Sequence, residues 1–250
     1  MKTLSILGLG AFGQLMAQHL VGHVKLMAYD PAKQAVSYAR QKGIAFVSLE
    51  EAARADLVVI ATPIDKIAGV VDAIKPHIKP GAIVLDVASV KVLPAKAMET
   101  LPDYVDIICT HPLFGPQSAR NGIVGLKIAV CPIRGDSYIK VAEFFRSKLG
   151  LEVIMTTPEE HDREVAAVQG LTHMIAKVLV EMEPLPKKMT TVSFDLLMAA
   201  VELVRYDSME LFLAIERDNP FSAELRHKFF TKGKELRDFL ESHNTSAKNR

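Results

Sequence analysis

The chain has 250 residues, of which 49% are hydrophobic and 24% are charged, and its formal net charge is +1. Such a composition is typical of a globular protein with enough apolar residues for one large core or two smaller ones. Basic and acidic residues are evenly mixed, so no surface for nucleic acid or for an anionic membrane is indicated. No apolar run approaches the roughly 18 residues that span a bilayer, and the N-terminus does not resemble a signal peptide. We therefore expect a cytoplasmic protein of two domains.

Short apolar runs alternate with amphipathic stretches over residues 1–156. Continuous runs rich in Val, Ile and Leu predict buried strands at 4–7, 24–29, 57–61, 82–85, 105–109, 127–131 and 152–155. Helical spacing predicts helices at 12–21, 31–42 and 64–74. This alternation predicts an α/β domain, built on a mostly parallel sheet with helices on both faces. The two cysteines, Cys109 and Cys131, fall in strand-like runs and are expected to be buried free thiols.

The sequence changes character near residue 157. The run Thr157-Pro158-Glu159-Glu160 is typical of a helix start, with a capping threonine, a proline in the first helical position and two acidic residues. Long apolar stripes then predict helices at 159–182, 191–217 and 223–241. We predict an all-helical second domain over residues 157–241, followed by a flexible tail at 242–250.

A glycine-rich motif, Gly8-Leu9-Gly10-Ala11-Phe12-Gly13, follows the first predicted strand and opens the first predicted helix. In that setting, the first glycine permits a tight turn, the second lets a pyrophosphate approach, and the third allows close packing of helix against strand. The helix N-terminus offers free N–H groups and the positive end of its dipole to the phosphates. We therefore predict a Rossmann-type dinucleotide site formed by Gly8, Gly10, Ala11, Phe12 and Gly13.

Asp30 ends the second predicted strand, about 20 residues after the motif. Its carboxylate can accept a hydrogen bond from the ribose 2′-hydroxyl and would repel a 2′-phosphate, so NAD is favoured over NADP. A turn or cap at Asp30-Pro31 is the alternative interpretation. Thr62 and Pro63 follow the third predicted strand, and we expect them to border the nicotinamide side of the same site.

The loop after the fourth predicted strand carries Ser89 and Lys91. The Ser89 hydroxyl can hydrogen-bond a substrate oxygen or a neighbouring imidazole, and a turn or cap role is the alternative. Lys91 could attract a carboxylate, but a solvated surface charge is the favoured interpretation.

His111 leaves the fifth predicted strand into a loop punctuated by Pro112, Gly115 and Pro116. A histidine can accept a proton near neutral pH, and this loop follows a strand end, where the cofactor is expected. We therefore predict that His111 removes a proton during hydride transfer to a nicotinamide ring.

A second candidate histidine, His173, lies in the run Gln169-Gly170-Leu171-Thr172-His173 on the first helix of the second domain. Gln169 and His173 are four residues apart and therefore share one helix face. A polar strip of this kind is typical of a buried substrate cleft, whereas a hydrogen-bonded core histidine is the alternative.

Taken together, these motifs resemble those of the prephenate and arogenate dehydrogenases of tyrosine biosynthesis. The resemblance covers roughly residues 1–240, and its histidine segment is closer to the plant-type branch. It rests on the glycine motif with Asp30, the Ser89-Val90-Lys91 loop, the segment Thr110-His111-Pro112-Leu113-Phe114-Gly115-Pro116-Gln117-Ser118-Ala119, the helix with Gln169 and Thr172-His173, and the run Asp207-Ser208-Met209-Glu210-Leu211-Phe212.

The resemblance implies an oxidative decarboxylation. Hydride passes from the ring carbon that bears the hydroxyl to NAD, and the ring carboxylate leaves as carbon dioxide. By the same resemblance, His111 is the catalytic acceptor of the hydroxyl proton, and Ser89 orients His111 or the hydroxyl. Substrate binding is implied for Gln169, Thr172 and His173.

Two departures from the family pattern concern charge. Many bacterial members use an arginine of the helical domain to grip the substrate carboxylate, and its segment is missing here. That role stays open among Arg205, Lys177 and Arg217. Plant-type members usually carry a cofactor loop suited to NADP, whereas Asp30 favours NAD.

Asn121 bears on the choice of substrate. In the plant-type branch, an acidic residue shortly after the histidine segment is associated with arogenate, whose ammonium group it can pair with. A neutral residue at that place is associated with prephenate. The resemblance therefore implies that Asn121 contacts prephenate, with arogenate as the alternative substrate and an Asn-Gly turn as the structural alternative.

Two other function classes stay open. A β-hydroxyacid dehydrogenase of similar build would use a lysine of the helical domain as its acid or base, and Lys177 is a candidate. A non-enzymatic NAD-binding protein would keep the glycine motif but would not need Ser89, His111 and His173 together.

The helical domain is also expected to form a homodimer. Its apolar stripes exceed what a small bundle buries internally, and they include Leu196, Met198, Leu203 and Leu211. The family resemblance supports the same expectation.

Overall fold

The computed structural model describes residues 2–247. The chain divides into two compact units, Met1–His161 and Asp162–Arg250. The division falls inside the helix α7 (Pro158–Val165), whereas the sequence places the domain boundary just before it, at residue 156. Among the described residues, no helix is both long and apolar enough to cross a membrane.

The first unit is built on a single eight-stranded sheet. Its strands are β1 (Thr3–Leu7), β2 (Lys25–Tyr29), β3 (Ala45–Phe46), β4 (Leu57–Ile60), β5 (Ile83–Asp86), β6 (Asp106–Pro112), β7 (Lys127–Arg134) and β8 (Glu152–Met155). They lie in the order β3-β2-β1-β4-β5-β6-β7-β8, and all neighbours are parallel except β6 and β7. The chain leaves β3 at one edge and returns to β4 beside β1. This reversal of strand order marks the place where open α/β sheets bind ligands.

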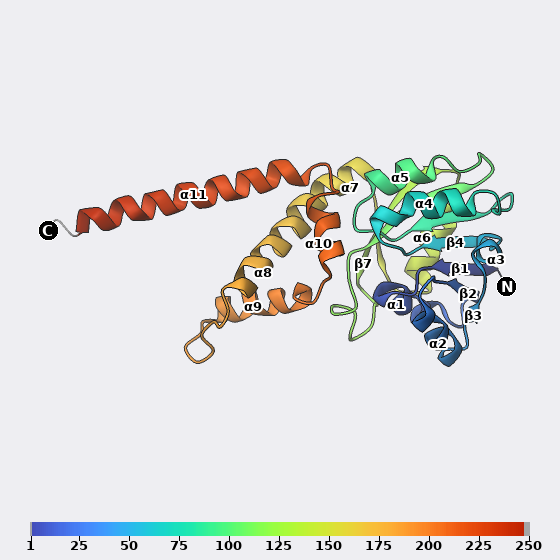
Figure 1. Cartoon of the computed structure of the whole chain (residues 1–250), viewed down its shortest axis with the longest axis horizontal. Helices are drawn as coiled ribbons and strands as arrows, with labels where there is room; N and C mark the ends of the chain where they lie inside the picture. The colour runs from blue at the N-terminus through green and yellow to red at the C-terminus, as the bar shows by residue number, and fades with distance from the viewer. Residues whose placement is uncertain (1, 248–250) are drawn as a thin grey trace. The chain divides into compact units, whose positions relative to one another are not determined.

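Helices cover both faces of the sheet (Figure 1). They are α1 (Ala11–Leu20), α2 (Lys33–Gln41), α3 (Leu49–Ala53), α4 (Ile64–Ile74), α5 (Val92–Met98) and α6 (Tyr138–Ser147). Helices α1, α2 and α6 share one buried cluster with Val59 and Leu85, whereas α3, α4 and α5 share another with Val58 and Val84. Successive strand residues thus pack into the cores on opposite faces of the sheet, which explains the continuous apolar runs in the sequence.

The structure confirms the predicted fold class, a mostly parallel sheet followed by helices. Elements β3, α3, α5 and α6 have no counterpart among the predicted ones. With two and five residues, β3 and α3 are too short to carry a periodic pattern. Cys109 and Cys131 are buried thiols outside any disulfide, as expected, and they lie directly opposite each other on β6 and β7.

The second unit is all helical. Its first long helix runs from α7 through a π-helical turn, η1 (Ala166–Gly170), into α8 (Leu171–Glu181) without a break. It is followed by α9 (Val192–Val204), α10 (Met209–Glu216) and α11 (Ser222–Ala247). Figure 1 shows α11 as a single long rod. Single π-helical turns within α-helices often occur at functional sites.

Two predictions for this unit are wrong. The helix predicted at 191–217 is interrupted between α9 and α10, because the Ser208 hydroxyl accepts a hydrogen bond from the Leu211 N–H and starts a new helix. The tail predicted from residue 242 is instead part of α11, which continues to Ala247. No proline occurs within residues 222–247 to stop the helix. Residues 248–250 lie outside the described range.

Candidate active site

The carboxyl ends of four neighbouring strands meet along one edge of the sheet. Leu7, Ile60, Asp86 and Cys109 are successive register partners across β1, β4, β5 and β6. Residues shortly after these positions therefore lie along the same edge. They are the glycine motif, Thr62, Ser89 and His111. The strand register therefore brings these motifs to one edge of the sheet, and their roles in a site stay predictions.

The glycine motif has the geometry that dinucleotide binding needs. Gly8 has a φ of +108°, and a Cβ atom there would lie 2.5 Å from the Ala61 carbonyl oxygen. A Cβ on Gly13 would lie 2.0 Å from the Gly8 carbonyl oxygen, so both positions require glycine for packing. The Cβ position of Gly10 has no atom within 4 Å. Packing does not demand glycine at Gly10, whereas the close approach of a pyrophosphate would.

The start of α1 adds a second feature that suits phosphate. Gly10 is the N-cap residue, and the first turn, which includes Ala11 and Phe12, contains no acidic side chain. The first N–H groups of a helix have no intrahelical partner. This end of α1 can therefore donate hydrogen bonds to an anion.

Asp30 accepts a hydrogen bond from the backbone of the glycine motif. One carboxylate oxygen, Oδ2, accepts a hydrogen bond of 2.7 Å from the Leu9 N–H, and the other, Oδ1, accepts one of 2.7 Å from the Ala32 N–H. The turn role considered for Asp30 is therefore present. Each carboxylate oxygen has two lone pairs, so the side chain can still accept hydrogen bonds from a ribose.

Thr62 presents a buried hydroxyl at the end of β4. Its Oγ1 atom is inaccessible to solvent and has no hydrogen-bond partner among the described residues. Pro63 follows as the N-cap residue of α4. A buried hydroxyl without a partner costs free energy, so a polar ligand group at this position would stabilise it.

The prediction that Lys91 is a solvated surface charge is wrong. Its side chain is fully buried, not a solvated surface charge. It forms an ion pair with Asp86 and donates a hydrogen bond of 2.6 Å to the Thr110 carbonyl oxygen. The Thr110 hydroxyl in turn donates to the Asp86 carbonyl oxygen. Lys91 therefore joins the ends of β5 and β6 and is not available to bind a substrate carboxylate.

His111 is held rigidly at the end of β6. It is the next-to-last residue of the strand and not part of a loop, and its side chain is only 3% exposed. Its Nδ1 atom lies 2.9 Å from Nε2 of His161, which is 4% exposed. Burial, followed by His161 and Lys91, lowers the pKa of His111 well below its usual range. His111 is therefore a neutral imidazole near pH 7.

No hydrogen bond joins Ser89 or Asn121 to His111 among the described residues. Ser89 is half-buried. Asn121 is exposed in the turn region that precedes Gly122, whose φ is +101°. The turn alternative therefore describes the local backbone at Asn121, and the substrate roles of both residues stay predictions.

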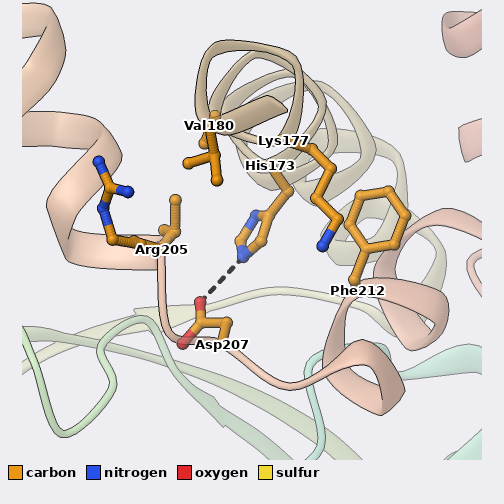
Figure 2. A pocket seen from close by; sticks show the side chains of 8 residues that line it. His173, Lys177, Val180, Arg205, Asp207 and Phe212 are labelled. Carbon is orange, nitrogen blue, oxygen red and sulfur yellow. Dashed lines mark hydrogen bonds and ion pairs between the residues drawn. The ribbon is translucent and has the colours of Figure 1, made fainter. Parts of the chain in front are cut away.

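In the second unit, His173 is fixed by two acceptors. Its Nδ1 atom lies 2.8 Å from the Gln169 carbonyl oxygen, and its Nε2 atom lies 3.1 Å from Oδ2 of Asp207 (Figure 2). The Gln169 carbonyl belongs to the π-helical turn. Thr172 is exposed, and its hydroxyl donates to the Val168 carbonyl oxygen. Both nitrogens of His173 can donate in these contacts only when the ring is protonated.

A small cavity of about 40 Å³ adjoins His173 (Figure 2). Besides His173, its lining includes two basic side chains, Lys177 and Arg205. Arg205 is bound by two carboxylates, those of Glu183 and Glu202. The Lys177 ammonium forms no ion pair with a described residue and lies 5.9 Å from the centre of the Phe212 ring.

Sequence reasoning missed His161 and the role of Asp86. His161 directly follows the capping signal at 157–160, so its position indicated only a helix start. It lies fifty residues from His111 in the sequence. Asp86 ends a strand, and its distance of five residues from Lys91 gives no helical pairing signal. Arg217, another rival for the substrate carboxylate, pairs with its neighbour Asp218.

Comparisons with known proteins point to one family. A family model described as the nucleotide-binding domain of prephenate dehydrogenase matches residues 15–145. A probable arogenate/prephenate dehydrogenase of Methanocaldococcus jannaschii is 28% identical, over 96% of this chain and 57% of that protein. The chloroplastic arogenate dehydrogenase 1 of Arabidopsis thaliana is 28% identical, over 90% of this chain and 37% of that protein. The chain thus spans about half of the length of these relatives, or less.

Solved structures share the fold. Prephenate dehydrogenase from Aquifex aeolicus, in complex with hydroxyphenyl propionate and NAD+, is 22% identical with a TM-score of 0.73, over 94% of this chain and 90% of that chain. Arogenate dehydrogenase from Synechocystis is 21% identical with a TM-score of 0.62, over 99% of this chain and 92% of that chain. Because the family model matches just over half of its residues, the chain belongs to the prephenate dehydrogenase family.

Proposed function

We propose that this protein catalyses the NAD-dependent oxidative decarboxylation of prephenate to 4-hydroxyphenylpyruvate, a step of tyrosine biosynthesis. The observation that carries the proposal is the buried, neutral His111 at the strand edge that also bears the glycine motif. Bound NAD would supply the hydride acceptor. Gly8, Gly10, Gly13 and the start of α1 would hold its pyrophosphate, and Asp30 its ribose.

His111 would act as the general base. Because Nδ1 faces His161, Nε2 would be the nitrogen that accepts the proton of the substrate hydroxyl. A neutral histidine is ready to accept that proton, and general-base assistance contributes about 10²- to 10⁴-fold to a rate. Ser89 would donate or accept a hydrogen bond at the same hydroxyl, because its own hydroxyl is not committed to His111.

The second unit would bind the charged groups of the substrate. Lys177 is the best candidate for a substrate carboxylate, because Arg205 and Arg217 are already paired with acidic side chains. It lies one helical turn from His173 on α8, so both side chains share one face. Gln169 and Thr172 would complete this polar face.

Prephenate is favoured over arogenate because Asn121 carries no charge. An arogenate-selective site needs an anionic partner for the substrate ammonium, and a neutral amide cannot supply one. Substitution of Asn121 by Asp would therefore shift the preference towards arogenate. The arogenate dehydrogenase activity of the plant relative makes arogenate the second candidate substrate.

The test is NADH or NADPH formation from prephenate and from arogenate, each with NAD and with NADP. Wild-type protein, His111→Asn and Asn121→Asp would be compared. We expect the prephenate and NAD pair to be turned over fastest and His111→Asn to be nearly inactive while still binding NAD. Near-full activity of His111→Asn would overturn the mechanism. Turnover of a hydroxyacid instead of prephenate, with loss of activity in Lys177→Met, would favour a β-hydroxyacid dehydrogenase.

The enzyme is further proposed to be a homodimer through its helical unit. Large apolar side chains are exposed on α9 and α11, among them Leu196, Leu203, Phe230, Leu236 and Phe239. Large apolar side chains left exposed on two helices support burial against a second copy of the chain. Light scattering at micromolar concentration would return a dimer, and Leu196→Asp with Leu203→Asp would return a monomer. A wild-type monomer would contradict the proposal.

A further inference from the structure

A large apolar cavity lies inside the first unit, between α1, α6 and one face of the sheet. Its volume is about 430 Å³. Protein interiors are packed as densely as organic crystals, and voids much larger than a water molecule are few. Most of the lining side chains are aliphatic or aromatic, as in pockets that bind small molecules. The cavity therefore has the size and lining of a ligand site.

The cavity is elongated along the strands. Ile83, Leu85 and Val87 all line it, and alternate residues of a strand point to the same side. At about 3.3 Å per residue, these three positions span about 13 Å. Leu57 and Val59 of β4 line the same stretch. This shape suits a linear chain better than a compact ring.

Basic side chains gather at one end of the cavity. Lys2 and His23 precede the first residues of β1 and β2, so they lie at the amino edge of the sheet. Lys140 lies in the first turn of α6, which follows the antiparallel strand β7 and therefore begins at the same edge. All three side chains are exposed, and none of the lining residues is acidic.

Two acidic side chains of this edge form contacts within the protein. The Asp56 carboxylate accepts hydrogen bonds from Thr3 and pairs with Lys79 at 2.6 Å. The Asp106 carboxylate accepts a hydrogen bond of 3.0 Å from the Ser137 N–H. Neither carboxylate forms an ion pair with Lys2 or Lys140 among the described residues, so both ammonium groups can bind an anion.

The opposite end of the cavity is apolar. Phe12 of the glycine motif and Phe114, shortly after His111, line it, and their ring centroids are 6.2 Å apart. Pro112 lines the same end. One end thus offers positive charge, and most of the remaining lining is hydrocarbon, with Thr110 as a polar residue near Pro112.

We propose that this cavity binds a linear amphiphile with a carboxylate head, of the medium-chain fatty acid class. The head lies at Lys2 and Lys140, and the chain runs along β4 and β5 towards Phe114. The positive charge at the basic end of the cavity favours an anionic head group. The length and the apolar lining of the cavity favour an alkyl chain. This site shares Phe12 with the predicted dinucleotide site, but the proposal does not depend on the proposed reaction.

Calorimetric titration of the full chain with decanoate tests the proposal. We expect one decanoate per chain, with affinity that rises by up to about fourfold for each methylene from hexanoate to decanoate. Decyltrimethylammonium has the same chain and the opposite charge, and it should bind far more weakly. Absence of decanoate binding would overturn the proposal. Equal binding of the cationic amphiphile would overturn the assignment of an anionic head.

Matched variants locate the binding. Met16→Trp fills the cavity from α1 and should abolish decanoate binding, whereas Gln18→Trp, on an exposed position of the same helix, should leave it unchanged. Lys140→Glu should weaken binding about three- to tenfold, because it replaces an exposed ion pair with a repulsion. Lys148→Glu, exposed just after α6, is its control. Unchanged binding in Met16→Trp would place the amphiphile elsewhere and overturn the proposal.

Discussion

The Nδ1 atom of His111 lies 2.9 Å from Nε2 of His161, and both imidazoles are buried. Only one hydrogen lies between the two nitrogens of such a hydrogen bond, so its direction fixes which nitrogen of His111 carries a hydrogen. When His111 donates, its Nε2 atom has a free lone pair. When His161 donates, Nε2 carries the hydrogen and cannot accept a proton. A general base at this position requires the first arrangement.

Substitution of His161 is therefore expected to change catalysis through His111. His161→Leu removes the acceptor for the Nδ1–H and should lower kcat about 10²- to 10⁴-fold, as the loss of a tautomer-fixing partner does in catalytic triads. His161→Gln keeps an acceptor oxygen at a similar reach and should retain most of the activity. The measurement is kcat and KM for prephenate with NAD, together with thermal unfolding of each variant.

The two His161 variants separate a positioning role from a structural one. If His161 only fills space, both variants should lose stability alike and kcat should follow stability. Recovery in Gln but not in Leu, at similar stability, assigns the effect to the hydrogen bond. Equal activity of His161→Leu and wild type would refute the role.

The acid side of the pH profile should reflect the buried state of His111. Burial and the neighbouring positive charge lower its pKa well below 6.5, so the base form persists when an exposed histidine would be protonated. We expect kcat/KM to stay level as the pH falls through 6.5 and to drop only at more acidic values. An acid limb at or above 6.5 in wild-type protein would contradict the assignment of His111 as the essential base.

The same pKa shift predicts a pH dependence of stability. In the unfolded chain His111 takes up a proton near pH 6.5, whereas the folded state resists protonation until a lower pH. The unfolded state therefore binds more protons in that window, and the free energy of unfolding falls as the pH falls below 6.5. Urea unfolding of wild type and His111→Asn at several pH values should show a smaller loss on acidification in the variant. Parallel curves would show that His111 does not contribute.

The cofactor side of the site could be predicted from the sequence, and the histidine pair could not. Gly8, Gly10 and Gly13 act within one strand-turn-helix, so their spacing along the chain already fixes their geometry. His111 and His161 are fifty residues apart, and only the antiparallel return of β7 and the start of α7 bring them together. No local pattern encodes such a contact.

The prediction that Lys91 is exposed was wrong because its partner could not be identified from the sequence. Its charge predicts exposure, but it is neutralised by Asp86, which ends the preceding strand five residues earlier. The break before Ser208 was missed because no proline or glycine marks it. A serine cap followed by a new helix is visible only when the helix directions are known.

The three glycines of the motif should respond differently to alanine. Gly13→Ala places a Cβ 2.0 Å from the Gly8 carbonyl oxygen and should destabilise the fold strongly. Gly10→Ala meets no atom within 4 Å, so its stability should change by no more than about 1 kcal/mol, because a poorer N-cap offsets the lower entropy of the unfolded chain. Its affinity for NAD should nevertheless fall, because the methyl group occupies the approach of the pyrophosphate. Calorimetry with NAD and thermal unfolding measure the two effects separately. Unaltered NAD affinity in Gly10→Ala would argue against the proposed phosphate site.

The buried pair of Lys91 and Asp86 should be more important for the shape of the site than for its chemistry. Lys91→Met leaves the Asp86 carboxylate uncompensated and the Thr110 carbonyl without its donor, which should cost about 3–5 kcal/mol of unfolding free energy. Lys91→Met combined with Asp86→Leu removes both charges and should recover a large part of that loss. Urea unfolding of the single and double variants provides the measurement. If the pair only stabilises the edge, the double variant should also regain NAD affinity. A double variant no more stable than Lys91→Met would mean that the cost lies in the lost packing of the lysine stem and not in the unpaired charge.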